Sequence, residues 1–411
     1  MNLNQKLEDI YFMMSAKKRV VGIALITAIA VMGDSMLFVV LPIYWQDFGL
    51  RALWQIGVLL SINRFIRLPI NPLVGMFYQK FQLRTGVLIA LGLTVLTTMS
   101  YGILQHFWLL VLMRALWGVA WSLLRLGGYL TVIDVANDQS RGQYVGLYNG
   151  LWGIGGLVGM LAGGLLVDQT SILFVTSLFG ALGVLAIPAV WFLVPVSRRT
   201  DQEDNKETST ISKSKWVSKY VVMVLVTGVA MGFIVFGLFA STLSPLIERV
   251  YMNEWNLLQM TIGAATLAGI VQAIRWGWDP FVAPLIGKWL DASKTMLRIL
   301  LIPLFGGGLL FIVLGNLQSL FILLIALLIF QLLSTMFVTT TDTLAASAAA
   351  QTDRVKIITA HTIVVDIGAA LGPLISFIII EFYSLTTVYY IAGMLLILLG
   401  VGWLYFYKRH I

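Results

Sequence analysis

Residues 20–45 read VVGIALITAIAVMGDSMLFVVLPIYW, and this stretch decides the fold class because Asp34 is its single charged residue. A helix of about 20 apolar residues crosses the hydrocarbon core of a lipid bilayer. Eleven further stretches of this kind follow along the 411 residues, so the sequence predicts an all-α polytopic membrane protein with 12 transmembrane helices. The predicted spans are 20–45, 54–78, 85–105, 108–133, 144–167, 171–195, 217–246, 257–290, 297–315, 318–343, 357–381 and 385–407.

Lys and Arg are distributed unevenly over the segments between these spans. If the first span begins in the cytoplasm, Arg51 and Arg249 fall outside and 20 basic residues fall on the cytoplasmic side. Cytoplasmic loops of membrane proteins carry an excess of Lys and Arg, so this distribution predicts that both termini are cytoplasmic. The cytoplasmic group includes Lys17, Lys18, Arg19, Lys80, Arg84, Arg141, Arg198, Arg199, Lys213, Lys215, Arg298, Arg354, Lys356, Lys408 and Arg409.

The composition excludes several classes of function. Hydrophobic residues make up 59% of the chain and charged residues 11%, against about 25% charged residues in soluble domains. The net charge of +8 is scattered over short loops, which suits contact with anionic lipid headgroups and gives no indication of nucleic-acid binding. The chain has no cysteine and only three histidines, His106, His361 and His410, so no metal site or cofactor is expected. The N-terminal stretch shows no cleavable signal.

One long polar stretch, residues 196–216, divides the chain into two parts of similar length. Its mixed charge and its Ser and Thr content are typical of a mobile cytoplasmic linker. The sequence therefore predicts an N-terminal six-helix bundle at 1–195 and a C-terminal six-helix bundle at 217–411.

Short motifs repeat between the two parts. NPLVG at 71–75 matches APLIG at 283–287, and GxxxG at 159–163 matches GxxxG at 368–372. Both matches have nearly the same offset and fall on corresponding predicted spans. Two similar bundles in the same orientation are the parallel-repeat plan of one large class of transporters.

On these features the chain resembles the major facilitator superfamily over its full length, and within it the twelve-helix proton-coupled drug and metabolite exporters. The family's loop signature after the second span is GxxxD(R/K)xG(R/K)(R/K). Gly75, Lys80 and Arg84 match it, but Gln79 replaces the acid. The equivalent loop after the eighth span runs from Gly287 to Asp291 and keeps the acid, so Asp291 is the candidate counterpart.

Two further family signatures match in part. Arg114 in the fourth span is followed four residues later by Gly118, as the family requires. The glycine signature of the fifth span, which is associated with exporters, is incomplete because Gly164 stands where proline belongs. Glycines at such spacing also pack helices in membrane proteins of any function, and this alternative stays open. The residues expected to take part in gating and conformational change are Gly75, Lys80, Arg84, Gly150, Gly159, Gly163, Gly287, Asp291, Gly372 and Pro373.

Asp34 is the candidate proton-coupling residue. An isolated carboxylate in the middle of a span costs about 3 kcal/mol or more, so it must take up a proton or pair with a cation. The family resemblance implies a proton-handling acid on this helix, paired with the arginine of the fourth span, here Arg114. The alternative is a permanent structural pair between Asp34 and Arg114.

Five arginines and four acids lie within the predicted spans. Arg64 and Arg67 are three residues apart and share a helical face, so they must line a cavity or meet acids. Arg275 and Asp279 are four apart and can pair within one helix. The remaining ones are Arg114, Arg125, Asp34, Asp342 and Asp366.

Complete internal pairing of these charges is one interpretation. The other is that arginines face a central cavity and bind an anionic group, because a guanidinium binds carboxylate or phosphate with two parallel hydrogen bonds and stays charged. Aromatic side chains at the same level could stack on a substrate. The candidate substrate-binding residues are Asn63, Arg64, Arg67, Trp117, Arg125, Arg275, Trp276 and Asp366, and other nearby aromatics are Phe65, Trp121, Trp152 and Trp278.

The expected function is secondary active transport by alternating access: proton-coupled export of a small anionic or zwitterionic metabolite, such as a carboxylate-type siderophore. Enzymatic activity is not expected. A broad multidrug/proton antiporter, a proton-coupled importer of an organic anion, and a receptor or lipid-moving protein are the alternatives. His361 lies near Asp366 and is either part of a proton relay or a helix–helix hydrogen bonder. The expected partners are a small-molecule substrate, protons and membrane lipids, with the chain acting as a monomer in a bacterial inner membrane.

Overall fold

The computed structural model describes residues 3–136, 140–194, 218–251, 255–257, 260–292, 296–350 and 353–410. The predicted linker 196–216 lies outside these ranges. Ten helices in the described part are long and apolar enough to cross a membrane. The chain is a multi-pass integral membrane protein, and large apolar side chains such as Phe192, Leu185 and Phe321 are exposed on its outside, as lipid contact requires.

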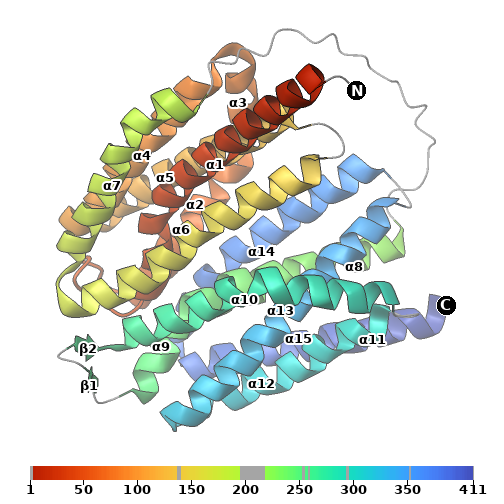
Figure 1. Cartoon of the computed structure of the whole chain (residues 1–411). Coiled ribbons are helices and arrows are strands. Elements are labelled where there is room, and N and C mark those ends of the chain that lie inside the picture. Colours follow the sequence, from red (N-terminus) through yellow and green to blue (C-terminus); the bar gives the residue numbers. More distant parts are fainter. Residues whose placement is uncertain are drawn as a thin grey trace.

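Figure 1 shows two groups of helices side by side, one coloured red to yellow-green and the other green to blue. We name them the amino-terminal half (residues up to 194) and the carboxy-terminal half (from residue 218). The amino-terminal half consists of α1 (Leu3–Val40), α2 (Leu53–Phe65), α3 (Arg67–Lys80), α4 (Leu83–Ile103), α5 (Phe107–Val135), α6 (Arg141–Gln169) and α7 (Ile172–Leu193).

The carboxy-terminal half contains two helices that pass through π-helical turns, η1 (Gly232–Phe239) and η2 (Ile302–Gly306). Its other elements are α8 (Lys219–Met231), α9 (Ala240–Val250), β1 (Trp255–Leu257), β2 (Met260–Ile262), α10 (Ala264–Ala292), α11 (Met296–Leu301), α12 (Gly307–Leu314), α13 (Leu320–Ala350), α14 (Arg354–Phe382) and α15 (Leu385–His410).

The prediction of an all-α protein misses one β-hairpin. Strands β1 and β2 pair antiparallel, with Leu257 opposite Met260 and Trp255 opposite Ile262. The predicted span 257–290 therefore begins too early, because the apolar residues at its start belong to the hairpin and α10 begins at Ala264. Hydropathy alone cannot separate a short apolar strand from the first turns of a helix.

Proline changes the first two predicted spans. The predicted span 20–45 ends at Val40, because the residue before Pro42 is disfavoured in a helix. The predicted span 54–78 is divided at Ile66 into α2 and α3. Pro69 explains this break, since its ring has no N–H for the carbonyl oxygen of Phe65 and pushes that carbonyl away. Neither this divided helix nor α10, which carries Arg275 and Asp279, is among the ten apolar spans, so the number twelve stays a prediction.

Each half has its own buried core. In the amino-terminal half Trp117 and Tyr148 are among the largest fully buried side chains. In the carboxy-terminal half Phe330 lies 4.5 Å from both Phe239 and Phe311 between ring centroids. Close-packed aromatic contacts of this kind hold each group of helices in a defined shape.

The two halves meet where α2 packs against α14 and α6 packs against α10. A Cβ atom added at Gly57 would lie 2.8 Å from the carbonyl oxygen of Pro373, so the α2–α14 contact requires glycine at this position. A Cβ added at Gly164 would collide with the carbonyl oxygen of Ala265 at the α6–α10 contact. We call the end of the molecule that carries β1 and β2 the hairpin end, and the opposite end, where both termini lie, the termini end (Figure 1).

Candidate functional site

A cavity of about 500 Å³ lies between the two halves. Helices α1, α2, α3, α5 and α6 form one wall, and α8, η1, α9, α10, α13 and α14 form the other. Its charged and titratable lining residues are Asp34, Arg64, Arg67, Arg125, Arg275, Asp342, His361 and Asp366.

The cavity continues into a second space of about 220 Å³, which shares Arg67, Trp121, Arg125 and Asp366 with it. The second space follows α3 and α5 toward their later residues, and these lie at the termini end. The site therefore extends from the middle of the molecule toward the termini end.

Hydrogen bonds between the halves close the hairpin end. Asp168, in the last turn of α6, accepts hydrogen bonds from the backbone N–H groups of Gly263 and Thr266, at 3.0 and 2.9 Å. The hydroxyl of Thr266 also donates to Asp168 at 2.5 Å, and Tyr44 donates to its other oxygen at 2.7 Å. This carboxylate thus caps the N-terminus of a helix in the opposite half, a favourable place for negative charge. We call it the Asp168 latch.

A second contact of the same type joins the halves at this end. The backbone N–H of Leu53, at the first residue of α2, donates to Glu381 at 2.6 Å. Glu381 lies in the last turn of α14, so a carboxylate of the carboxy-terminal half caps a helix of the amino-terminal half. We call it the Glu381 latch.

Asp34 lies on α1 and is held in place by two side chains. Arg114 of α5 forms an ion pair with it, and the amide of Asn63 donates to the same carboxylate oxygen at 3.3 Å. Arg114 is 1% exposed and also donates to the backbone oxygen of Leu59 at 2.8 Å. The predicted contact between Asp34 and Arg114 is present in the structure, while its role in proton coupling stays a prediction.

Arg64 and Asp366 form an ion pair across the cavity, with 3.6 Å between Nη1 and Oδ1. It joins α2 of one half to α14 of the other. The neighbouring Arg67 makes a different contact: its guanidinium lies 5.3 Å from the ring centroid of Trp121. Neither Arg67 nor Arg125 forms an ion pair with an acid of the described residues, and Nε of Arg67 is buried without a hydrogen-bond partner.

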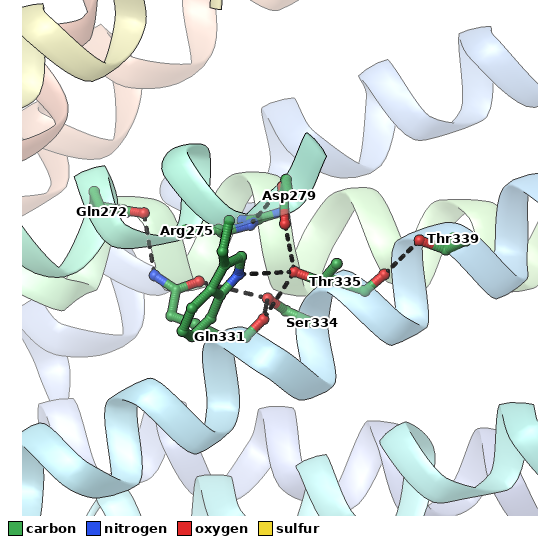
Figure 2. A network of polar contacts seen from close by, with 8 residues as sticks. Gln272, Arg275, Asp279, Gln331, Ser334, Thr335 and Thr339 are labelled. Atoms are coloured by element: carbon green, nitrogen blue, oxygen red, sulfur yellow. Dashed lines mark hydrogen bonds and ion pairs between the residues drawn. The ribbon is translucent and has the colours of Figure 1, made fainter. Parts of the chain in front are cut away.

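Arg275 is held by the carboxy-terminal half itself. Its Nε lies 3.7 Å from the carboxylate of Asp279 one turn further along α10, and its guanidinium lies 5.4 Å from the ring centroid of Phe236. Figure 2 shows Asp279 between Arg275 and Thr335, whose hydroxyl donates to the carboxylate at 2.5 Å. The same network joins Gln331 to Gln272 at 3.4 Å. The pairing predicted for Arg275 and Asp279 is confirmed.

Three tryptophans form a continuous apolar row from one half to the other. Trp121 of α5 and Trp152 of α6 lie 5.0 Å apart between ring centroids, and Trp152 and Trp276 of α10 lie 6.1 Å apart. All three line the cavity. An organic substrate with a ring or an alkyl body would lie against this surface.

Two titratable groups of the carboxy-terminal wall have few partners. Asp342 of α13 is exposed to the cavity and has no ion pair or hydrogen bond with any described residue. His361 of α14 is 7% exposed, and its Nε2 has no hydrogen-bond partner. Within the described part of the chain, no hydrogen bond joins His361 to Asp366, so the structure lacks the direct contact that a proton relay between them needs.

The structure brings together most of the predicted substrate-binding residues. Arg64, Arg67, Arg125 and Asp366 line the cavity, as do Arg275 and Trp276. Two predictions are wrong on position: Asn63 and Trp117, each 1% exposed, do not line it. Asn63 points at Asp34 instead, and Trp117 packs in the amino-terminal core, 6.4 Å from Trp121.

Some of the predicted gating glycines pack against a neighbouring helix, and others have open space beside them. Gly159 and Gly163 pack against Met32 and Met36 of α1, so their contact lies within one half. Gly372 packs against Gly237 within the other half, whereas the carbonyl oxygen of Pro373 faces Gly57 across the interface. By contrast, no atom lies within 4 Å of a Cβ added at Gly75, Gly150 or Gly287.

The predicted charged gating residues lie at the termini end. Arg84 donates two hydrogen bonds, of 3.0 and 2.8 Å, to the backbone oxygen of Val194 just after α7. Lys80 is exposed. Asp291 belongs to α10, but its side chain lies outside the described part. Their gating role stays a prediction.

Sequence reasoning missed several polar residues of the cavity, among them Asn149, Gln272 and Thr362. Gln272 lies three residues before Arg275, and Thr362 lies four residues before Asp366. Residues three or four apart share a helical face, so a polar residue at this distance from a charged one was an available signal. Asn149 accepts a hydrogen bond from Trp152 at 3.1 Å, which no spacing in the sequence indicates.

A solved structure supports the fold. A bacterial homologue of the human lysosomal transporter Spinster, in an inward-facing and unoccupied conformation, superposes with a TM-score of 0.77. It covers 96% of this chain and 97% of that chain, at 13% sequence identity. Likeness at this level of identity shows the fold alone.

Sequence relatives and a family model agree with the fold shown by this likeness. The tetracycline resistance protein, class H, of Pasteurella multocida is 23% identical over 293 residues, 69% of this chain and 70% of that protein. The multidrug resistance protein MdtG of Citrobacter koseri is 24% identical over 284 residues, 65% and 66% of the two chains. The sequence model of the Major Facilitator Superfamily matches residues 23–278, well over half of the chain. The chain therefore belongs to the Major Facilitator Superfamily and is a transporter of small molecules rather than an enzyme.

Proposed function

We propose that this transporter exports a small anionic or zwitterionic organic molecule in exchange for protons. The observation that carries the proposal is the charge of the cavity. Arg67 and Arg125 line it, and neither forms an ion pair within the described residues. Buried or half-buried cations without a counter-ion favour an anionic group arriving from outside the protein.

Arginine is suited to this task for two reasons. Its planar guanidinium binds a carboxylate or phosphate with two parallel hydrogen bonds, and it keeps its charge. Arg67 also rests on Trp121, which holds the guanidinium plane in one orientation. A substrate with a carboxylate and an apolar body would use both the arginines and the tryptophan row, and a carboxylate-type siderophore is one such molecule.

Proton coupling is assigned to Asp34 with Arg114. Asp34 lines the cavity, while Arg114 lies behind it and is 1% exposed. A carboxylate in this position changes its ion pair when it takes up a proton, because a neutral carboxyl group no longer attracts the guanidinium. Such a change next to the substrate site can link protonation to the arrangement of α1, α2 and α5.

Alternating access is assigned to rocking of two bundles, 1–195 and 217–411, about the cavity. We assign the termini end to the cytoplasm on the distribution of Lys and Arg. The two latches close the other end and the cavity extends toward the termini end, and both features support our assignment of an inward-facing state. Bacterial relatives support a bacterial inner membrane. The proposed unit of transport is a single chain surrounded by membrane lipids.

The direction of transport is assigned to export because two relatives are named as resistance proteins. One of these names also favours a second candidate, a broad multidrug/proton antiporter. In that case Asp34 binds lipophilic cations and the cavity arginines have a structural role.

Proton movement in inside-out vesicles tests the proposal. A respiration-driven pH gradient is read with a pH-sensitive dye while polycarboxylates, zwitterions and lipophilic cations are added in turn. Anionic or zwitterionic compounds should collapse the gradient with the wild-type protein and with Lys288→Gln, an exposed lysine away from the cavity. They should fail with an Arg67→Gln/Arg125→Gln variant. Collapse by lipophilic cations alone would favour the multidrug antiporter.

A further inference from the structure

Uncompensated charge of opposite sign faces the cavity from its two walls. On the amino-terminal wall, Arg67 and Arg125 have no ion pair with described residues. On the carboxy-terminal wall, Asp342 is exposed to the same cavity and has neither an ion pair nor a hydrogen bond there. A ligand that satisfies all three groups must carry an anionic group and a cationic group.

The other charges of the cavity are already compensated. Asp34 pairs with Arg114, Asp366 pairs with Arg64, and Arg275 pairs with Asp279. The charged or titratable groups on elements packed against α13 are Lys219 and Tyr220 of α8, Glu248 and Arg249 of α9, Arg275, Asp279 and Lys288 of α10, Arg298 of α11, and Lys356, His361, Asp366 and Glu381 of α14. Of these, Arg275, His361 and Asp366 line the cavity with Asp342, and among the described side chains none pairs with it.

The tryptophan row runs from the amino-terminal wall of the cavity to the carboxy-terminal wall. Trp121 shares α5 with Arg125 and contacts Arg67, while Trp276 lies on α10 in the opposite wall. These rings offer no charge, so they give the cavity a continuous apolar surface that begins beside Arg67 and reaches the wall that carries Asp342. The ligand's two charged groups are therefore joined by an apolar body that contacts the row.

We infer that the transported molecule is a zwitterion, with a carboxylate bound by Arg67 and Arg125 and an ammonium group bound by Asp342. This inference rests on the proposed function and narrows its substrate class. Protonation of Asp34 acts on the arrangement of the helices, whereas direct exchange at the substrate site requires that substrate and proton compete for one group. A plain anion cannot compete with a proton for arginine, since the guanidinium stays protonated. An ammonium group competes directly with a proton for the carboxylate of Asp342.

In each transport cycle, one proton moves in and one zwitterion moves out. From the outer side, a proton bonds to a carboxylate oxygen of Asp342, and the substrate leaves with its ammonium group unchanged. After the cavity opens to the cytoplasm, this O–H bond breaks, the proton passes to water, and the ammonium group of the next substrate takes its place. One positive charge enters for each neutral zwitterion that leaves, so transport responds to membrane potential as well as to pH.

Binding to the purified full-length protein tests the two-point contact. The probes are phenylalanine, tryptophan and 4-(aminomethyl)benzoic acid, each beside its methyl ester, which lacks the anion, and its N-acetyl derivative, which lacks the cation. At least one zwitterion should bind about tenfold more tightly than both of its derivatives, because each derivative loses one charge-assisted contact. Asp342→Asn should remove the advantage over the N-acetyl derivative and leave the affinity of that derivative unchanged. If no zwitterion exceeds its derivatives, the inference is overturned.

Charge movement in proteoliposomes separates this inference from the proposed function. A potential-sensitive dye should report net charge transfer with the zwitterion for the wild type and for Lys288→Gln, and none for Asp342→Asn. Proton movement driven equally well by the N-acetyl derivatives would keep proton-coupled export of anions and overturn the zwitterion. Proton movement with none of the compounds would overturn the proposed function itself.

Discussion

Asp168 and Thr266 belong to opposite halves of the molecule, and the carboxylate of Asp168 accepts hydrogen bonds from both the backbone N–H and the hydroxyl of Thr266, at 2.9 and 2.5 Å. Together with the N–H of Gly263, these donors form the N-terminus of α10. The hairpin end is therefore closed by directional polar contacts in addition to the glycine-mediated packing of helices. Opening this end must break them together.

Asp168→Asn should weaken closure of the hairpin end. A hydrogen bond to a charged group contributes about 1.5–3 kcal/mol, and 1.4 kcal/mol changes an equilibrium tenfold, so the open fraction should rise roughly tenfold. The chain has no cysteine, so spin labels can be attached at Thr170→Cys and Tyr383→Cys without background, and their distance distribution measured.

Ser171→Ala is the matched control for this experiment. Ser171 caps α7 by accepting a hydrogen bond from Phe174 at 3.2 Å, and both residues belong to the same half. Loss of this cap should leave the distance distribution unchanged. A distribution that stays the same in Asp168→Asn as well would show that helix packing alone holds this end closed.

Arg67→Lys and Arg125→Lys keep the positive charge but remove the planar guanidinium. Affinity for an anionic compound found in the vesicle assay should fall about tenfold, since one of two parallel hydrogen bonds is lost. Folding should survive, as judged by the thermal transition of the purified protein. Normal transport by either variant would contradict binding of a carboxylate by that arginine.

Asp34→Asn leaves Arg114 buried without a counter-ion, and breaking a buried pair in this way costs about 3–5 kcal/mol. The variant should therefore show a lower thermal transition and no gradient-driven flux. Asp34→Asn with Arg114→Gln should recover most of the stability but not the flux, because no titratable carboxyl group remains on α1 to link protonation to the arrangement of the helices. Recovery of flux in the double variant would assign the pair a purely structural role.

Gly164→Val should prevent full closure of the hairpin end, because its side chain would collide with the backbone of Ala265. The transporter should then be biased toward the opposite state, with substrate affinity measured from the cytoplasmic side reduced. Gly92→Ala is the control, since no atom lies within 4 Å of a Cβ added there. Equal label distances in the two variants would rule out the α6–α10 contact as a closing element.

Much of the fold was predictable because membrane helices need long apolar stretches. The contact of Asp34 with Arg114 was also predictable, since both charges lie in apolar spans and the family signature marks the arginine. Helix rotation was not predictable: Trp117 and Trp121 are one turn apart on α5, yet one is buried in the core and the other lines the cavity. Which of them faces the opposite half depends on packing that the local pattern of residues does not contain.

The helix break at Ile66 and the β-hairpin were not predictable for a similar reason. Pro69 was visible in the sequence, but its effect on Ile66 depends on whether neighbouring helices keep the chain straight. The hairpin at β1 and β2 was hidden because its residues are as apolar as those of the helix that follows. The free carboxylate of Asp342 could not be inferred either, since pairing of charges depends on distances between helices that are far apart in sequence.

The two latches use corresponding positions of the two halves. Asp168 ends α6 and holds the start of α10, while Glu381 ends α14 and holds the start of α2. In each half, the C-terminal turn of one helix caps the N-terminus of a helix in the other half. Two identical subunits form the same pair of equivalent contacts around a two-fold axis. In a symmetric dimer one substitution would alter both contacts at once. In a single chain they can diverge, and here Asp168 accepts from two residues across the interface whereas Glu381 accepts from Leu53. Each of the two contacts can therefore change by mutation independently of the other, whereas exact symmetry would keep them equal.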